Sequence, residues 1–203
     1  MIEPTPTGPC EAVLCLATAG VVGADILDAV EDAISDRVGL VVSRRPLLLD
    51  PTGAWDPVRG QYSSVAIMRR SIAAVPPGAA RLLLVTEVDI FVPVLSFVFG
   101  HAQLDGPVAI MATARLRQAF YGMEADAGLE IMRARIEALH EVGHTLGLTH
   151  CLDRACAMSL ATTVEHVDRK ADDYCSGCGA LVREALDRLR EPDRLMVGLG
   201  GTT

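Results

Sequence analysis

The sequence predicts a single compact α/β domain built on a mixed β-sheet. Segments typical of strands alternate with segments typical of helices over residues 1–150, an order that favours helices packed on a sheet. Half of the 203 residues are hydrophobic, which is ample for a core. No low-complexity linker or internal repeat divides the chain, so one domain is expected.

Five elements are expected in the N-terminal part of the chain. Continuous apolar runs predict buried strands, whereas apolar residues three or four apart predict helices. In chain order the elements are a strand at 12–17, a helix at 24–37, a strand at 40–49 broken at Pro46, a surface loop at 50–60 and a helix at 64–75. Pro76, Pro77 and Gly78 end that second helix.

The remaining elements place a long helix after the last strands. Strands are expected at 81–86, 97–103 and 107–113, the long helix at about 130–146 and a final helix at 181–189. Within the single domain of residues 1–203, we expect an N-terminal subdomain of about 1–147, which holds the sheet and the long helix, and a C-terminal subdomain of 148–203.

The predicted long helix carries the motif HEVGH, from His140 to His144. Residues four apart lie on one face of an α-helix, so these two imidazoles can point at one metal ion. Glu141 lies about 100° round the helix from His140 and is better placed to hold a metal-bound water than to act as an equal ligand. Taken alone, such a motif is often only the solvated face of a polar helix.

The residues after this motif favour a catalytic zinc site. A catalytic zinc usually has three protein ligands and one open position, and His150 supplies a third imidazole. For His150 to reach the ion, the chain must leave the helix sharply after Leu146. Gly147 tolerates the positive φ that such a turn requires. The extended motif H-E-x-x-H-x-x-G-x-x-H therefore predicts a site of three histidines.

Four cysteines follow directly. Cys151 and Cys156 form C-x4-C, and Cys175 and Cys178 form C-x-x-C, with 18 residues between the two pairs. This layout suits a closed, tetrahedral zinc site of four thiolates, which would be structural. Two disulfides, or four free buried thiols, are the alternatives.

The stretch from His140 to Cys178 resembles the signature of the archaemetzincins, a family in the metzincin clan of zinc peptidases. That signature joins H-E-x-x-H-x-x-G-x-x-H directly to C-x4-C-x-M and then to C-x-x-C, and the sequence matches it throughout. The segment 85–103 also resembles the central region of the family. The resemblance implies a metzincin-like fold with a twisted mixed sheet, a long active-site helix and a small C-terminal part braced by zinc.

The resemblance also implies roles for individual residues. It implies two zinc ions, one catalytic and one structural. Its ligands for the catalytic zinc are His140, His144 and His150, its general base is Glu141, and its ligands for the structural zinc are Cys151, Cys156, Cys175 and Cys178. Met158 falls where metzincins place the methionine of their Met-turn, which packs beneath the three histidines and is not a ligand.

Metzincins bind an extended peptide along an edge strand above the active-site helix, and by this resemblance residues 97–103 are our candidate for that edge. Edge addition requires an accessible strand, and this segment lies between turns that contain glycine. On sequence evidence, an ordinary interior strand is the alternative interpretation.

The chemistry of these residues predicts a zinc metallopeptidase. Zinc lowers the pKa of a bound water to about 7 and polarises a scissile carbonyl. Glu141 would take the proton of that water and pass it to the leaving amine. His101 and Tyr174 are candidates for a second electrophile, although a structural role is favoured for each. The alternative functions are a zinc-holding regulatory or binding protein with little hydrolytic activity and an amidase for a non-peptide amide.

Composition argues against several other partners. The net charge of −8 argues against nucleic acid, and the longest apolar stretch, near 90–99, is too short to span a membrane and contains Pro93. The first ten residues lack the features of a secretory signal, so we expect a cytoplasmic enzyme. A monomer that acts on a peptide or small protein is expected. Cys10 and Cys15 are expected to be ordinary core residues.

Overall fold

The structure, a computed structural model, describes residues 12–190, and for residues 46–48 it describes only the backbone. The core position predicted for Cys10 lies outside this range, whereas Cys15 is buried as predicted. No helix among the described residues has the length and apolar character that crossing a membrane requires.

A five-stranded mixed sheet forms the centre of the molecule. Its strands, in the spatial order β2-β1-β5-β8-β7, are β2 (Val41–Leu49), β1 (Val13–Ala19), β5 (Arg81–Thr86), β8 (Val108–Ala112) and β7 (Gly100–Ala102). The first four are parallel, and β7 runs antiparallel to β8 at the edge. The predicted mixed sheet is confirmed, and 97–103 contributes an edge strand rather than an interior one.

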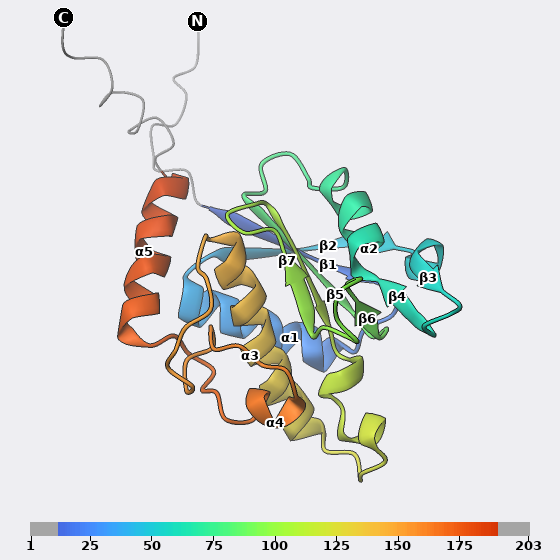
Figure 1. The fold of residues 1–203 in the computed structure, drawn as a ribbon. Coiled ribbons are helices and arrows are strands. Elements are labelled where there is room, and N and C mark those ends of the chain that lie inside the picture. Colours follow the sequence, from blue (N-terminus) through green and yellow to red (C-terminus); the bar gives the residue numbers. More distant parts are fainter. Residues whose placement is uncertain (1–11, 191–203) are drawn as a thin grey trace, which may run out of the picture.

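Helices cover both faces of this sheet (Figure 1). One face packs against α1 (Ala24–Ala33) and α3 (Ala127–Thr145), and the other against α2 (Ser64–Ile72). The last helix, α5 (Ser176–Arg190), joins the core of α1 and α3 from the side. Alternate strand residues supply the two cores, because successive side chains of a strand point to opposite faces. In β1, for example, Leu14 and Leu16 join the larger core, whereas Cys15 and Ala17 join the smaller one.

The segment predicted as a surface loop at 50–60 contains short elements of regular secondary structure. A 3-10 turn (Pro51–Ala54) leads into β3 (Trp55–Asp56), which forms a small second sheet with β4 (Gln61–Ser63) and β6 (Ile90–Phe91). The Asp56 carboxylate closes the turn by accepting hydrogen bonds from the backbone N–H groups of Val58 and Arg59. Strands of two residues are too short to leave a periodic pattern in the sequence.

Other boundaries differ modestly from the predicted ones. The helix from α1 continues as a π-helical turn (Ile34–Val38) before Gly39. The second strand runs through Pro46, but its register with β1 shifts between Leu16 and Thr18. Proline is tolerated there because β2 is an edge strand. Two 3-10 turns (Ala114–Leu116 and Gln118–Tyr121) lead to α3, and a short α4 (Val164–Val167) precedes α5.

Ion pairs hold the segment after α4 against α3. Three alternate residues of this segment each pair with a different residue of the helix, in the pairs Asp168–Arg133 (2.6 Å), Lys170–Glu137 (3.2 Å) and Asp172–Arg135 (2.9 Å). The Arg133 guanidinium also donates to the Leu116 carbonyl, so its burial leaves few donors unsatisfied. These pairs fix the C-terminal part of the chain beside the helix that carries the HEVGH motif.

Candidate active site and metal centres

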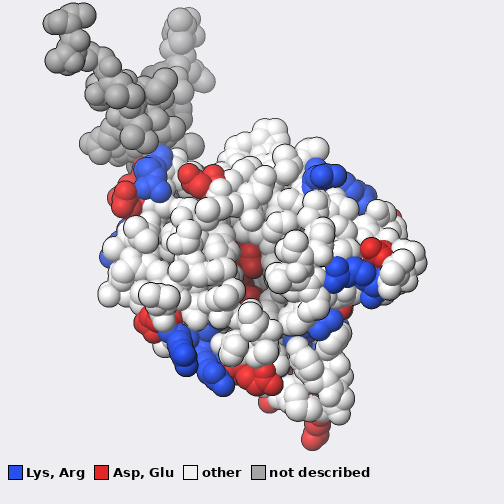
Figure 2. Space-filling view, viewed as in Figure 1, with Lys and Arg blue, Asp and Glu red and all other residues white. Residues whose placement is uncertain are grey.

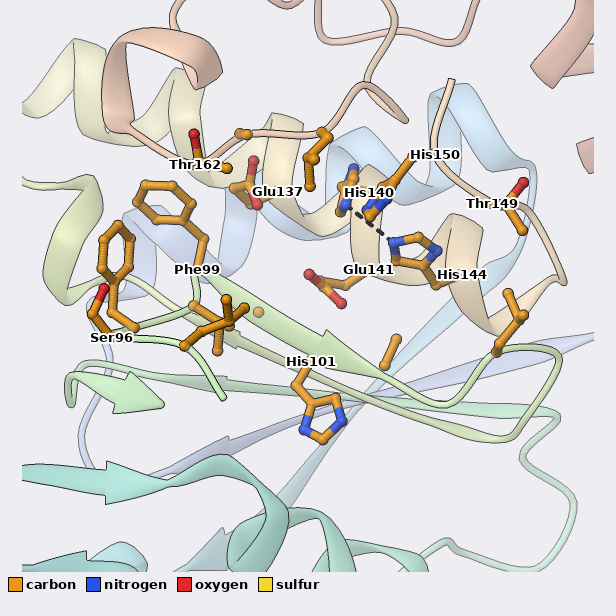
Figure 3. Close-up of a pocket in the computed structure, with 18 residues that line it drawn as sticks. Ser96, Phe99, His101, Glu137, His140, Glu141, His144, Thr149, His150 and Thr162 are labelled. Carbon is orange, nitrogen blue, oxygen red and sulfur yellow. Dashed lines mark hydrogen bonds between the residues drawn. The ribbon is translucent and has the colours of Figure 1, made fainter. Parts of the chain in front are cut away.

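Three histidines converge at the C-terminal end of α3 (Figure 3). His140 and His144 come from successive turns of the helix, and His150 from the chain that follows it. One ring nitrogen from each lies within 4.8 Å of the others. Gly147 has φ +90°, so the sharp exit predicted at this glycine is confirmed. The structure thus brings together the three residues that the motif predicts as metal ligands.

Hydrogen bonds orient two of these rings toward a common point. His140 Nδ1 lies 2.8 Å from the Ala157 carbonyl, and His144 Nδ1 lies 2.7 Å from the Leu148 carbonyl. Because a carbonyl only accepts, each Nδ1 carries the proton and each Nε2 presents a lone pair. The two Nε2 atoms are 3.1 Å apart, an arrangement that a cation between them would stabilise. Two nitrogens bound to a tetrahedral zinc lie roughly 3.3 Å apart, so the spacing fits this ion.

The protein environment favours neutral imidazoles. Burial lowers the pKa of His140 well below the usual 6.5, and the nearby Lys170 and His144 lower it further. Burial also lowers the pKa of His144 and of His150. The neutral ring is the form that binds a metal, so these shifts keep the three ligands available at neutral pH.

Glu141 lies between the histidines and the edge strand (Figure 3). Its side chain is buried against Gly100 of β7, where an added Cβ atom would overlap the carboxylate. The Oε2 atom is buried without a hydrogen-bond partner among the described residues. Burial raises the pKa of Glu141 well above its usual value, and the charge of Glu137 raises it further. A carboxylate with a raised pKa is a stronger base, which suits proton transfer near neutral pH.

Met158 packs against the same helix. It is fully buried, and an added Cβ atom on Gly143, between the two helical histidines in sequence, would overlap its sulfur. The backbone N–H of Cys151 donates to the Met158 carbonyl at 2.9 Å. The chain that carries His150 is thereby tied to the segment beneath α3.

The four cysteines gather in a second cluster. Their sulfur atoms all lie within 4.8 Å of one another, and the Sγ atoms of Cys151 and Cys175 are 3.8 Å apart. Two sulfurs on a tetrahedral zinc are roughly 3.8 Å apart, whereas a disulfide requires about 2 Å. All four residues are free thiols, so the alternative of two disulfides is wrong for this structure. Burial raises the pKa of Cys156 and Cys178, and a dication among the sulfurs would reverse this effect.

A cleft of about 500 Å³ opens beside the histidines. One wall is formed by residues 95–102, which include β7, and the other by α3 and residues 160–162. Of the described residues that line it, Glu137 and Glu141 are the only ones with a charged side chain apart from the histidines. Figure 2 shows acidic atoms at the bottom of a hollow whose rim is mostly uncharged.

Comparison with known proteins identifies the family. The model of peptidase family M54 matches residues 62–184, more than half of the chain. The chain belongs to peptidase family M54.

Relatives of this M54 peptidase match it over most of their length. The archaemetzincin of Methanocaldococcus jannaschii is 36% identical over 165 residues, which cover 81% of this chain and 89% of that protein. The archaemetzincin of Methanopyrus kandleri is 35% identical over 163 residues, which cover 80% and 89%. The predicted resemblance to archaemetzincins is confirmed, and the predicted enzyme class, a zinc metallopeptidase, is that of the family.

Solved structures share the fold of this M54 peptidase. The crystal structure of archaemetzincin from Methanopyrus kandleri matches with a TM-score of 0.77 and 34% identity, over 92% of this chain and 100% of that one. A zinc-dependent peptidase from Methanocorpusculum labreanum matches with a TM-score of 0.73 and 30% identity, over 83% and 99%. The predicted α/β fold class is therefore confirmed.

The two candidates for a second electrophile in this M54 peptidase have other contacts, although His101 lines the cleft. The Tyr174 hydroxyl donates to the Leu139 carbonyl at 2.6 Å, and burial raises its pKa. His101 Nδ1 lies 3.0 Å from Ser64 Oγ, and Figure 3 shows its ring directed away from the three histidines. Each side chain has a structural contact, as the favoured interpretation expected.

Sequence reasoning missed one charged pair at this site. Glu137 lines the cleft one turn before Glu141, and its Oε1 atom is 3.2 Å from the ammonium of Lys170. Burial raises the pKa of Glu137, an effect that Lys170 opposes. Two signals were available in the sequence: Lys170 is the only lysine of the chain, and Glu137 precedes Glu141 by four residues on one helix face.

Proposed function

We propose that this chain hydrolyses peptide bonds at a zinc ion held by His140, His144 and His150, with Glu141 as the general base. The observation that carries this proposal is the pair of unprotonated Nε2 atoms, 3.1 Å apart, beside a buried carboxylate on the wall of an open cleft. Membership of a peptidase family supports a peptide as the substrate.

The residues around the site have distinct roles in this mechanism. When bound, zinc supplies a Lewis acid that polarises the scissile carbonyl and lowers the pKa of a water. Glu141 accepts the proton of the attacking water and returns it to the leaving amine. Gly100 has no side chain, which leaves room for the Glu141 carboxylate to lie against β7. The carbonyls of Ala157 and Leu148 fix the orientation of two ligand rings.

The edge strand is the proposed peptide-binding element. Among the described strands β7 pairs only with β8, so its other edge is open to an added strand. A peptide paired there passes over Glu141, because that side chain packs against Gly100 of β7. The site then lies between the two proposed subdomains: residues 1–147 supply β7 and α3, and residues 148–203 supply His150 and the opposite rim.

A second zinc ion is proposed at the cysteine cluster. Its ligands are Cys151, Cys156, Cys175 and Cys178. Since Cys151 follows His150 directly, the metal braces the loop that holds the third histidine, and Met158 supports α3 from below as a Met-turn residue. We further propose a cytoplasmic monomer without a nucleic-acid or membrane partner, which the net charge of −8 and the free thiols support.

Cleavage of a peptide library by the wild type and by Glu141→Gln tests the proposed function. Glutamine keeps the shape of the side chain but cannot take a proton, so the wild type should cleave and the variant should not. A peptide hydroxamate, which chelates zinc, should block the wild type. Cleavage by Glu141→Gln at the wild-type rate would overturn the mechanism. The alternative of a binding protein is not favoured, because such a scaffold has no use for a buried base beside an open metal position.

A further inference from the structure

The pair Glu137–Lys170 is almost completely withdrawn from solvent. The side chain of Lys170 is 0% exposed and that of Glu137 is 3% exposed, and they meet at 3.2 Å. Burying two charges is expensive, and replacing such a pair by apolar residues is often neutral or stabilising. The pair therefore calls for an explanation other than stability.

The two partners are not equivalent with respect to the cleft. Glu137 lines it, whereas Lys170 is not among the lining residues. In Figure 3 Glu137 appears on the same side of the cleft as Phe99 and Thr162. A substrate in the cleft thus meets the carboxylate, while the ammonium that holds it lies behind. No lysine or arginine is present among the described lining residues to neutralise it from the cleft side.

The cleft that Glu137 lines has apolar residues as well as this acceptor. Phe99 and Leu160 line the same cleft, and Lys170 pairs with one oxygen of the Glu137 carboxylate, Oε1. A long side chain with an apolar stem and a cationic tip fits this arrangement, because the stem covers the apolar walls and the tip pairs with the carboxylate. An acidic tip would be repelled, and an apolar one would give the second carboxylate oxygen, Oε2, no hydrogen bond beyond the pairing of Oε1 with Lys170.

We propose that Glu137 is a specificity-determining residue, which selects substrates that place an arginine or lysine side chain in the cleft next to the scissile bond. This inference rests on the proposed function. Lys170 acts as a positioning residue that holds the Glu137 carboxylate at the wall of the cleft. The ion pairs on both sides of it, Asp168–Arg133 and Asp172–Arg135, fix Lys170 in turn.

Binding of peptide hydroxamates to the zinc-loaded protein tests this selection without any need for turnover. The compounds differ only in the side chain next to the chelating group, which is arginine, citrulline, norleucine or glutamate. Citrulline has almost the shape of arginine but no charge. The arginine compound should bind about tenfold or more tightly than the norleucine compound, as one charge-assisted hydrogen bond allows. The citrulline compound should lie between them, and the glutamate compound should bind most weakly.

Two variants assign the preference to Glu137. The double variant Glu137→Gln with Lys170→Met removes both charges together, so that no buried charge is left alone, and it should bind the arginine and citrulline compounds equally. Asp172→Asn is the matched control: it weakens a neighbouring ion pair that does not line the cleft and should keep the preference for arginine. A double variant that still prefers arginine over citrulline would overturn the inference.

The same measurement separates failure of the inference from failure of the proposed function. Equal binding of all four compounds to the wild type would overturn the selection by Glu137 and leave the zinc peptidase intact. If none of them binds, although zinc is present in stoichiometric amount, the open metal position itself is refuted, and the inference falls with it.

Discussion

Two glycines near the histidines allow neighbouring side chains to pack closely against the backbone. Gly143 and Gly100 illustrate this, because a methyl group at either position would overlap Met158 or Glu141. The motif predicted the metal ligands from spacing alone, since four residues along a helix return to the same face. It did not predict Gly100, because the approach of β7 to α3 depends on the tertiary fold.

Glu141→Gln should retain both proposed metals and lose cleavage. A positioned general base contributes about 10²–10⁴-fold to the rate, so kcat should fall by roughly that factor. The metal content per chain, measured alongside peptide cleavage, checks both parts. A variant that loses a metal as well would mean that Glu141 acts as a ligand.

Gly100→Ala should displace the Glu141 carboxylate, because the added methyl group occupies its position. We expect kcat to fall by about tenfold or more, as small misplacements of a reacting group are costly, while metal content stays unchanged. Gly128→Ala, near the start of α3, is the control and should keep wild-type kcat. If Gly100→Ala cleaves peptides at the wild-type rate, the catalytic role of Glu141 does not require its packing against Gly100 of β7.

Zinc at the histidines should persist below pH 6.5. Burial lowers the pKa of His140 well below 6.5, so protons compete with the metal only in more acidic solution. The lowered pKa also affects the stability of the metal-free protein. The unfolded state binds the proton more readily than the folded state, so the free energy of unfolding falls as the pH falls below about 6.5. The zinc content per chain is measured against pH for the wild type and for His144→Ala, and the difference between the two gives the zinc at the histidines. A midpoint above pH 6.5 would contradict the prediction.

Helices and strands differ in how well the sequence predicted them. The long helix, expected at about 130–146, runs from Ala127 to Thr145: Gly147 predicted its end, whereas the capping Asp126 starts it earlier than predicted. β3 was predicted as part of a loop and β4 was not predicted, since strands of two or three residues leave no period. The last helix starts at Ser176, before the predicted 181, because the C-x-x-C turn leads directly into it.

The segment after α4 depends on its ion pairs with α3. Asp168→Asn removes the charge that faces the buried Arg133, which is only 3% exposed. The free energy of unfolding should fall by about 2 kcal/mol, a typical loss for a hydrogen bond to a charged group. Urea unfolding of the zinc-loaded protein measures this change. Glu184→Gln, which removes an exposed pair with Arg188 on α5, is the control and should change little.

The whole molecule joins two proposed metal sites through one short stretch of chain. His150 and Cys151 are neighbours, and Cys151 is tied to Met158 beneath α3. The pair of Glu137 and Lys170 also depends on the whole fold. The two residues are 33 positions apart in the sequence, so no local pattern predicted that they would meet. Long-range contacts of this kind are the part of the site that sequence reasoning could not supply.

The two metal sites should be coupled through the loop that joins them, and to the same extent in both directions. Cys175→Ser should release the structural zinc and also weaken zinc binding at the histidines, because the loop that carries His150 loses its brace. His144→Ala should release the catalytic zinc and leave zinc at the cysteine cluster, which shares no ligand with it, but the zinc affinity of the cluster should fall by the same coupling factor. Zinc titration of the metal-free variants measures both effects. Unchanged affinity at the histidines in Cys175→Ser would remove the bracing role.

Zinc content and peptide cleavage in the wild type and in His144→Ala show whether the three histidines hold a catalytic zinc that is separate from a structural one. The wild type should hold about two zinc ions per chain and cleave peptides, and the variant should hold about one and cleave none. If His144→Ala keeps two zinc ions or still cleaves peptides, the three histidines do not hold a separate catalytic zinc.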